Sequence, residues 1–463
     1  MCLMVLGAIS FRNSIICRMI FVNIPWTSSN PAITCDEESI SFGNLHEALT
    51  SGRKGFALAG IQPGAPFPMQ VGNAVGDVIL LLSVLARGAI AAPINTRWPF
   101  EQVSRVSERL VPPKPPLTRR AGQVPALEDD WRLIVHTSGS GGDAKAAVLS
   151  SANCSASART AIERLGLGAG DRWLLSLPLY HVGGIGIVMR CLSAGATIVA
   201  LEAEESLEEA LARYELTHVS LVATQLYRLL QDDKAAEGLA AMKAVLLGGG
   251  PVPEGLVREA VERGIPIYAS YGMTETASMI ACTMPGDLIE RLLSSGRPLV
   301  EDTVSISDEG EILVRGETLF QGYLRPDGTL DRPLTADGWF ATGDLGFFDD
   351  EGYLHVTGRR DNMFVSGGEN IQPEEIERRL CALEGVEEAM VVAVDDEEWG
   401  QRPVAYVRMA SGALPEAGRL AEELRDVLPG YMIPRAVLPW PEGIVTGGIK
   451  ASRAELTRRA RDA

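Results

Sequence analysis

The sequence predicts an α/β protein that is built on parallel sheets and divided into more than one domain. Short apolar runs alternate with helix-length segments between Ser151 and Ala269. Strands that alternate with helices in this way form parallel sheets covered on both faces, and ligands bind beyond the carboxyl ends of the strands. The 463 residues also exceed what one hydrophobic core usually serves. Functional residues are therefore expected in the loops that follow the strands.

The composition, with 46% hydrophobic and 22% charged residues, is typical of a soluble globular protein. The net charge of −18 argues against nucleic acid or an anionic membrane as the main partner, because a polyanion would be repelled. If the protein binds an anionic nucleotide, local hydrogen-bond donors and a metal ion would have to hold it against this negative charge. The seven cysteines are scattered and include no C-x-x-C pair, which favours reduced thiols in the cytoplasm over disulfides or a zinc site.

The first residues, Met1 to Val22, are apolar but interrupted by Arg12 and Arg18. This segment makes a poor signal peptide and too broken a membrane span, so no stable membrane insertion is expected. We expect residues 1–18 to be dispensable, with the working protein beginning near Met19. Helix and strand patterns then alternate from Ile40 to Leu110, before a proline-rich connector.

A strand is predicted from Trp131 to His136, followed by the glycine-rich run TSGSGGDAK that ends at Lys145. Small residues let backbone N–H groups converge on one small volume, which suits a phosphate. A Walker loop is excluded because Lys145 lies between two alanines. A dinucleotide-binding turn is disfavoured because an extended run, not a helix, follows. A glycine-rich hairpin without a ligand stays an alternative.

The remaining elements follow from the alternating pattern. Helices are expected to begin at Ser151 and to span 185–193, 207–214, 224–230 and 253–263, and strands to span 173–177, 196–201, 218–222, 244–247 and 266–269. Past Gly296 short strands and turns predict a β-rich subdomain. A small α+β domain follows, with a helix from Pro373, strands at 390–394 and 404–409, and a helix at 420–428. The run GRRD, which begins at Gly358, is a plausible hinge between these parts.

The loops after the predicted strands carry an ordered set of motifs: TSGSGGDAK, PLYHVGG, LGGGPVP, YGMTETAS, TGD, GRRDN, SGGENIQPEEIE and GGIK. This set resembles the adenylate-forming superfamily of acyl- and aryl-CoA synthetases, luciferases and peptide-synthetase adenylation domains. The resemblance implies a large N-terminal domain (residues 1–358), a hinge (359–361) and a small mobile C-terminal domain (362–463). It also implies ATP and CoA as co-substrates and Mg²⁺ as cofactor.

The resemblance assigns a nucleotide site. The phosphates would be held by Thr137, Ser138, Gly139, Ser140, Gly141, Gly142 and Lys145. Glu275 beside Thr274 would bind Mg²⁺, which offsets phosphate charge, although a lone glutamate is more often a solvated surface residue. The adenine would lie against Gly249 and Gly250, with Tyr271 as an aromatic wall next to Gly272. Asp344 would take the ribose hydroxyls with Arg359 as its partner; a surface ion pair is the alternative.

The small domain would supply the moving parts. Lys450 resembles the lysine that stabilises charge on the carboxylate and α-phosphate during adenylation. Asp361 would be the hinge residue, and rotation about it would exchange the Lys450 loop for a CoA-side loop of Ser366, Gly367 and Gly368. Gly141 and Ala144 depart from the family pattern, which usually has Thr and Pro there.

Within the superfamily, the chain resembles the o-succinylbenzoate–CoA ligases of menaquinone biosynthesis, on LLSLPLYHVGGIGIVMRCL, VATQLYRLL and SGGENIQPEE with GGIK. The resemblance implies the reaction of o-succinylbenzoate, ATP and CoA to o-succinylbenzoyl-CoA, AMP and pyrophosphate. This acid has a second carboxylate, for which Arg190 is the candidate; a structural ion pair is the alternative. His181 would gate the acid pocket, unless it is a core imidazole, and Gln225 and Ser278 would line it.

Three other functions stay open. They are another aryl- or medium-chain acyl-CoA synthetase, an adenylation domain that loads a carrier-protein thiol, and a nonenzymatic nucleotide-binding module. The expected partners are otherwise a small carboxylic acid, ATP and CoA, with a homo-oligomer as a further expectation.

Overall fold

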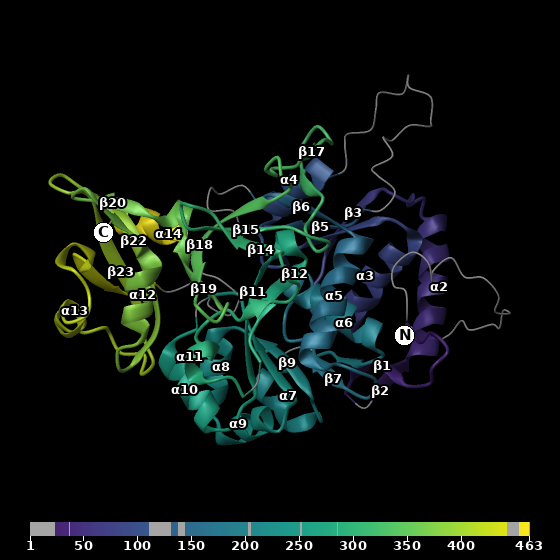
Figure 1. Ribbon diagram of the computed structural model, residues 1–463. Helices are drawn as coiled ribbons and strands as arrows, with labels where there is room; N and C mark the ends of the chain where they lie inside the picture. Colours follow the sequence, from purple (N-terminus) through teal and green to yellow (C-terminus); the bar gives the residue numbers. More distant parts are fainter. Residues whose placement is uncertain are drawn as a thin grey trace.

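The structure is a computed structural model, and it describes residues 24–36, 38–110, 131–137, 144–201, 205–250, 252–284, 286–441 and 453–462. A large part with three sheets is followed by a smaller α+β part at the C-terminal end (Figure 1). This architecture confirms the predicted α/β class. The segment expected to be dispensable and the proline-rich connector lie outside the described residues. None of the helices in the described ranges is both long and apolar enough to cross a bilayer.

The first sheet has nine strands with a parallel centre, as the alternation of strands and helices predicts. Its six central strands, from β11 to β1, are parallel. The edge strands β2, β12 and β13 are antiparallel, which the alternation did not predict. The order across the sheet is β13 (Arg297–Pro298), β12 (Ser278–Cys282), β11 (Ile267–Met273), β10 (Ala244–Leu247), β9 (His218–Leu221), β7 (Arg172–Leu174), β8 (Thr197–Val199), β1 (Pro31–Cys35) and β2 (Glu38–Ser41).

The second sheet is mixed, and it carries the glycine-rich run. Strands β3, β4 and β5 are parallel, whereas β5, β6, β16 and β17 pair antiparallel. The run therefore connects the two strands of a hairpin, β5 and β6. The order is β17 (Leu330–Asp331), β16 (Gly322–Leu324), β6 (Ala146–Ser150), β5 (Trp131–His136), β4 (Ile90–Ile94) and β3 (Pro66–Gln70).

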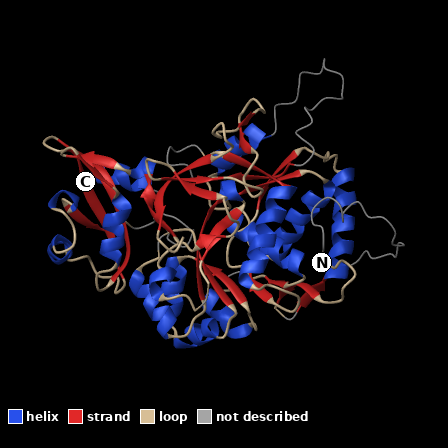
Figure 2. Ribbon diagram, in the orientation of Figure 1, coloured by secondary structure: helices blue, strands red, loops and turns tan. Residues whose placement is uncertain are grey.

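Helices α3, α5 and α6 lie between these two sheets (Figures 1 and 2). Residues 184–192 of α6 are all buried, as expected for a helix that is apolar nearly all round. A Cβ at Gly184 would lie 2.3 Å from the Pro178 carbonyl oxygen, so only glycine fits there. The helices of the large part are α2 (Phe42–Leu58), α3 (Val75–Arg87), α4 (Phe100–Leu110), α5 (Ser151–Leu165), α6 (Val182–Ala194), α7 (Leu207–Arg213), α8 (Ala223–Leu230), α9 (Asp233–Ala240), α10 (Glu254–Glu262) and α11 (Ile289–Leu292).

The predicted helices and strands of this region agree with the observed elements to within a few residues, and α9 was missed. Its sequence, DKAAEGLA, contains a single large apolar residue, so it shows little helical periodicity. The helix begins because Asp232 caps it, with its carboxylate accepting from the N–H groups of Lys234 and Ala235.

The third sheet and the small part follow the predicted change to short strands. The third sheet has the order β14 (Val304–Ile306), β15 (Glu311–Val314), β18 (Phe340–Phe348) and β19 (Leu354–Arg359). The small part has a hydrophobic core of its own, which includes Ile371, Ile376, Val391 and Leu420. Its elements are β20 (Phe364–Ser366), β21 (Glu369–Ile371), α12 (Pro373–Cys381), β22 (Val386–Asp396), β23 (Gly400–Met409), α13 (Ala417–Arg425), β24 (Ala436–Pro439) and α14 (Arg453–Asp462).

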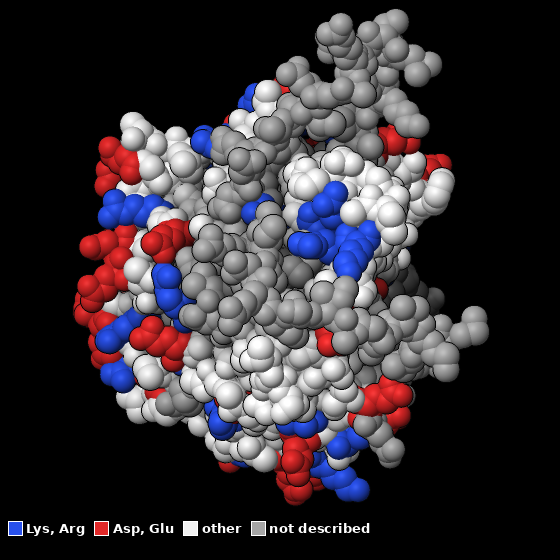
Figure 3. Space-filling model, turned by 90° about the vertical axis from the view of Figure 1, so that its right-hand side faces the viewer, with Lys and Arg blue, Asp and Glu red and all other residues white. Residues whose placement is uncertain are grey.

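The surface charges on the face in Figure 3 do not form one continuous acidic field. Acidic and basic side chains are mixed along one edge of this face, and a compact basic group lies apart from them. The net charge of −18 is therefore compatible with local sites for anions.

Asn153, near the start of α5, connects two segments of the chain that are distant in the sequence. The side chain is 4% exposed and donates to the carbonyl oxygens of Glu317 and Leu319, both at 2.7 Å. Its Oδ1 accepts from Ser150 and Gln321. Through these bonds, Asn153 connects the start of α5 to the segment that leads into β16.

We expect Asn153→Ala to lower the free energy of unfolding by about 2–4 kcal/mol, because buried carbonyl groups lose their donors. Denaturant unfolding measures this change. Asn44→Ala, at an exposed position of α2, is the matched control and should stay within about 0.5 kcal/mol of the parent protein. Equal stabilities of the two variants would contradict the role given to Asn153.

Candidate active site

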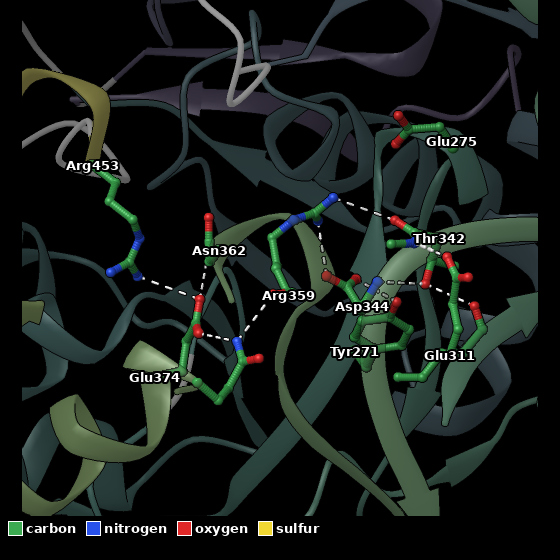
Figure 4. Close-up of polar contacts among 12 residues, drawn as sticks. Tyr271, Glu275, Glu311, Thr342, Asp344, Arg359, Asn362, Glu374 and Arg453 are labelled. Atoms are coloured by element: carbon green, nitrogen blue, oxygen red, sulfur yellow. Dashed lines mark hydrogen bonds and ion pairs between the residues drawn. The ribbon is translucent and has the colours of Figure 1, made fainter. Parts of the chain in front are cut away.

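The carboxylate of Asp344, in β18 of the third sheet, lies against Tyr271 of the first sheet and Arg359 (Figure 4). Tyr271, in β11, donates its hydroxyl to Asp344 Oδ2 at 2.6 Å. Arg359, the last residue of β19, lies 2.8 Å from Asp344 Oδ1 and also donates to the Thr342 carbonyl oxygen at 3.3 Å. The Asp344 side chain is 10% exposed and that of Arg359 is 42% exposed. The pair is thus more enclosed than an ordinary surface ion pair.

Tyr271 stays protonated in this arrangement. Burial raises the pKa of its hydroxyl well above the ordinary value, and the Asp344 carboxylate raises it further. Each oxygen of Asp344 accepts one of these bonds, and a carboxylate has about four lone-pair sites. A carboxylate held in this way is the kind of acceptor that sugar hydroxyls require.

Glu275 lies in the short 3₁₀ helix η1 (Thr274–Thr276), between β11 and β12, and is 8% exposed. Its Oε1 accepts from the Tyr323 hydroxyl at 2.6 Å. The two residues after η1, Ala277 and Ser278, have φ values of 53° and 120°, which are unfavourable for residues other than glycine. Such strain clusters at functional sites.

The surroundings of Glu275 fit a Mg²⁺ ion that is held mainly by substrate. Mg²⁺ commonly takes one or two carboxylates, several waters and substrate phosphates. In the described ranges, no group of three or more His, Cys, Asp or Glu side chains could hold a metal by itself. Glu275, with one oxygen bonded to Tyr323 and the other outside that bond, suits the single-carboxylate case.

Lys145 and Thr137 mark the two ends of the glycine-rich loop. The Thr137 N–H donates to the Lys145 carbonyl oxygen at 2.9 Å, which closes the neck of the hairpin. The Lys145 ammonium lies 5.0 Å from the centre of the Tyr323 ring, a cation–π contact. Five other residues predicted to bind phosphate lie outside the described residues: Ser138, Gly139, Ser140, Gly141 and Gly142.

Sequence reasoning missed Tyr323, which contacts both Lys145 and Glu275. Its strand β16 pairs with β6, with Tyr323 opposite Ala147. Burial, followed by the Glu275 charge, raises the pKa of the Tyr323 hydroxyl above its ordinary value, so it remains a donor. The signal in the sequence was only a tyrosine in a short strand, 48 residues after Glu275.

The glycines expected to lie near the adenine belong to β11 or follow its neighbouring strand β10. Gly249 and Gly250 are exposed and follow the carboxyl end of β10, with Gly249 at a φ of 86°. Gly272 lies in β11 where a Cβ would be 2.1 Å from the Ser278 carbonyl oxygen, so glycine is required by the pairing of β11 with β12.

Arg190 is a buried cation at the centre of α6. It is 1% exposed, and its Nη2 donates to the Ser278 hydroxyl at 2.8 Å. Among the described residues no carboxylate lies within ion-pairing distance, and its buried Nε has no hydrogen-bond partner. Burial lowers the pKa of Arg190 to about 10, so the guanidinium remains charged at neutral pH. The structural ion pair considered above is absent from the described part of the chain.

A small pocket lies beside Arg190, lined by side chains that are largely apolar. Its lining residues are Leu149, Cys154, Ser157, Ala158, Val182, Ile185, Gly186, Met189, Arg190 and Ala277. His181 is the N-cap residue of α6 and directly precedes Val182, which lines this pocket. The centre of its ring lies 4.6 Å from that of Tyr180. Gln225 uses its Oε1 to accept from the Val222 N–H at the start of α8. Its place in the acid pocket stays a prediction.

The described residues among the parts predicted to move lie in the small part or in the segment that leads into it. Asp361 lies in the 3₁₀ helix η2 (Arg360–Asn362) and is exposed. Ser366 is buried, whereas Gly367 and Gly368 are exposed, with φ values of 59° and 89°. Trp399, which sequence reasoning missed, packs where a Cβ of Gly367 would be. Lys450 lies outside the described residues.

The fold and this site define an adenylate-forming enzyme. The AMP-binding enzyme family matches residues 107–324, and the AMP-binding enzyme C-terminal domain matches residues 375–443. A 2-succinylbenzoate–CoA ligase of Salmonella typhimurium is 37% identical over 95% of this chain and 98% of the relative. One of Bacillus cereus is 33% identical over 88% and 91% of the two chains. The chain therefore belongs to the 2-succinylbenzoate–CoA ligase family of AMP-binding enzymes.

Solved structures agree with this assignment. An arginine-to-lysine variant of E. coli MenE with bound OSB-AMS is 31% identical, with a TM-score of 0.83 over 96% of this chain and 99% of that one. MenE from Bacillus subtilis in complex with ATP and magnesium ion is 27% identical, with a TM-score of 0.78 over 92% of this chain and 96% of that one.

We expect Tyr323→Phe to raise the Mg²⁺ concentration needed for half-maximal activity by about tenfold, because a bond to a charged group is lost while the ring under Lys145 remains. Calorimetric binding of ATP, with and without Mg²⁺, gives a readout independent of turnover. ATP binding without the metal should change little.

Tyr431→Phe is the control for this substitution, since the small part holds that tyrosine away from Glu275. An unaltered Mg²⁺ dependence in Tyr323→Phe would show that the hydroxyl does not position Glu275.

Proposed function

We propose that this protein is an ATP-dependent, AMP-forming acid–CoA ligase whose acid is o-succinylbenzoate. The acid carboxylate would attack the α-phosphorus of ATP and release pyrophosphate, giving a mixed anhydride with AMP. The CoA thiol would then attack the carbonyl carbon, form the thioester and release AMP. A carboxylate is a poor electrophile, and the anhydride supplies the leaving group that it lacks.

The observation that carries the choice of acid is the buried Arg190, which contacts the Ser278 hydroxyl and the Trp173 ring but has no carboxylate partner among the described residues. Placing a cation in an apolar interior is unfavourable unless an opposite charge accompanies it. An arginine fork suits a carboxylate. o-Succinylbenzoate has one carboxylate to activate and a second to be recognised, and the names of the relatives agree with this substrate. An aryl acid with a single carboxylate would leave Arg190 unpaired.

The nucleotide would be held from three sides. Asp344 would accept the ribose hydroxyls, with Arg359 and Tyr271 orienting its carboxylate. Lys145 and the glycine-rich loop would meet the phosphates. Mg²⁺ on Glu275 would neutralise part of the phosphate charge. Tyr323 lies between Lys145 and Glu275 and would fix the separation of these two groups.

The proposal also includes the parts that serve the thiol step. Gly367, which lies against Trp399, and Gly368 are both exposed and would form the surface beside which CoA approaches. The reduced cysteines of the described chain agree with work in the cytoplasm. A homo-oligomer stays a prediction.

We expect Arg190→Gln to raise KM for o-succinylbenzoate by about 10- to 100-fold, because a charge-assisted bond to a carboxylate contributes about 1.5–3 kcal/mol. KM for ATP should change less than about threefold. Steady-state AMP release with CoA and a panel of aryl acids measures both constants. An acid with one carboxylate serves as the internal control.

Two results would contradict the assignment of o-succinylbenzoate as the acid. Wild-type protein could prefer a monocarboxylic acid, or Arg190→Gln could leave KM for o-succinylbenzoate unchanged. Arg258→Gln, a partly exposed arginine in α10, is the matched control for loss of one positive charge.

Lys450→Ala tests which of the two half-reactions depends on Lys450. We expect acyl-adenylate formation to fall by about 10²–10³, since a preorganised donor to the developing charge is removed. Thioester formation from synthetic acyl-adenylate should be spared. An equal loss in both half-reactions, each measured by single turnover, would contradict the role of Lys450.

A further inference from the structure

The predicted hinge is crossed by a polar contact that involves Gln372, at the start of α12. Its Nε2 donates to the carbonyl oxygen of Arg359 at 3.0 Å. Arg359 precedes the hinge residue Asp361, whereas Gln372 follows it. This bond therefore joins the large part to the small part, and a rotation about Asp361 must break it.

Gly358 lets Gln372 come this close. A Cβ on Gly358 would lie 2.2 Å from Gln372 Nε2 and 2.6 Å from its Cδ. The amide thus occupies the volume that any other residue at position 358 would fill. Two independent features, the hydrogen bond to Arg359 and the missing side chain at Gly358, place Gln372 against β19.

Glu374 is the group that holds Gln372 there. The carboxylate is partly buried, with 15% of the side chain exposed. It accepts from the Gln372 amide and, at 2.5 Å, from Asn362 Nδ2, and Arg453 Nη2 lies 3.3 Å from it. Figure 4 shows Asn362 and Arg453 converging on Glu374 from two sides, one on the hinge and one on α14. All three partners are donors, which only a carboxylate can accept together.

Arg453 links this cluster to the end of the chain. It pairs with Glu377 at 2.7 Å as well as with Glu374, and it donates to the Val391 carbonyl oxygen. In the sequence, Lys450 precedes Arg453 by three residues.

We propose that Glu374 is a positioning residue for acyl-adenylate formation: it fixes Gln372 across the hinge and Arg453 beside it, in the domain orientation that serves the first half-reaction. This inference rests on the proposed function. The contacts run without interruption from Arg453 through Glu374, Gln372 and Arg359 to Asp344, the expected ribose ligand. Helix α14, which begins at Arg453, is thus tied to the nucleotide side of the hinge. When the domain rotates for the thiol step, the bond from Gln372 to Arg359 is lost, so Glu374 has no such role there.

The test compares the two half-reactions in Glu374→Gln. The glutamine keeps the size of the side chain but offers one acceptor oxygen and turns a donor toward donors. We expect the rate of ATP–pyrophosphate exchange with o-succinylbenzoate to fall about tenfold, while thioester formation from preformed o-succinylbenzoyl-AMP stays within about twofold. A purely structural role would lower both rates together.

Two further variants make the result decisive. Gly358→Ala displaces Gln372 without touching Glu374, and it should show the same selective loss of the first half-reaction. Glu384→Gln removes an exposed carboxylate from the same domain and should leave both rates at the wild-type value. The inference is overturned if Glu374→Gln and Gly358→Ala both match wild type, or if both half-reactions fall by one factor. Should Glu374→Gln fail to fold, Gly358→Ala decides the matter alone. A wild-type protein that forms no acyl-adenylate would instead overturn the proposed function itself.

Discussion

The arrangement of the whole site depends on the carboxylate of Asp344, because it is the group that ties separate sheets to one another. It lies in the third sheet, it accepts from Tyr271 of the first sheet, and it pairs with Arg359 at the edge of the hinge. Glu311 forms a second acid–arginine pair nearby, within the third sheet: it pairs with Arg360 at 2.6 Å and accepts from the Gly343 N–H. Each of these acids is nearly buried, so each orients an arginine that begins the connection to the small domain.

The features that could be predicted from the sequence are those that depend on residues close together along the chain. The glycine-rich loop, the TGD run and the order of the motifs identify the superfamily, and the alternating pattern places each loop after a strand. Most helix bounds follow from local signals such as the Ser150 cap of α5. Even Arg190, the proposed partner of the second carboxylate, could be singled out, because its helix is otherwise apolar.

What the sequence did not reveal are the contacts between residues that are distant along the chain. Tyr323 meets Glu275 across 48 residues, and Arg453 meets Glu374 across 79. Tyr323 lies in a short strand and Glu374 in the first turn of a helix, and neither belongs to a periodic pattern of apolar residues. The sequence therefore offered no reason to expect that they would be partly buried. Their burial depends on how β16 pairs with β6 and how α14 lies along β22, and pairing of this kind is decided by the tertiary fold. The antiparallel edges of the first sheet were missed for the same reason.

The separate hydrophobic core of the small domain has a consequence for how such enzymes diversify. Ile371, Ile376, Val391 and Leu420 belong to one buried cluster of the small domain, and the bond from Gln372 to the Arg359 carbonyl oxygen beside β19 is polar. A unit that is self-contained in this way can be transplanted between relatives. The recipient would have to match the polar groups beside β19 and the approach of Arg228 to Glu387. With the acid assigned to Arg190 and the thiol step to the small domain, as proposed above, the two properties can evolve on separate genetic segments.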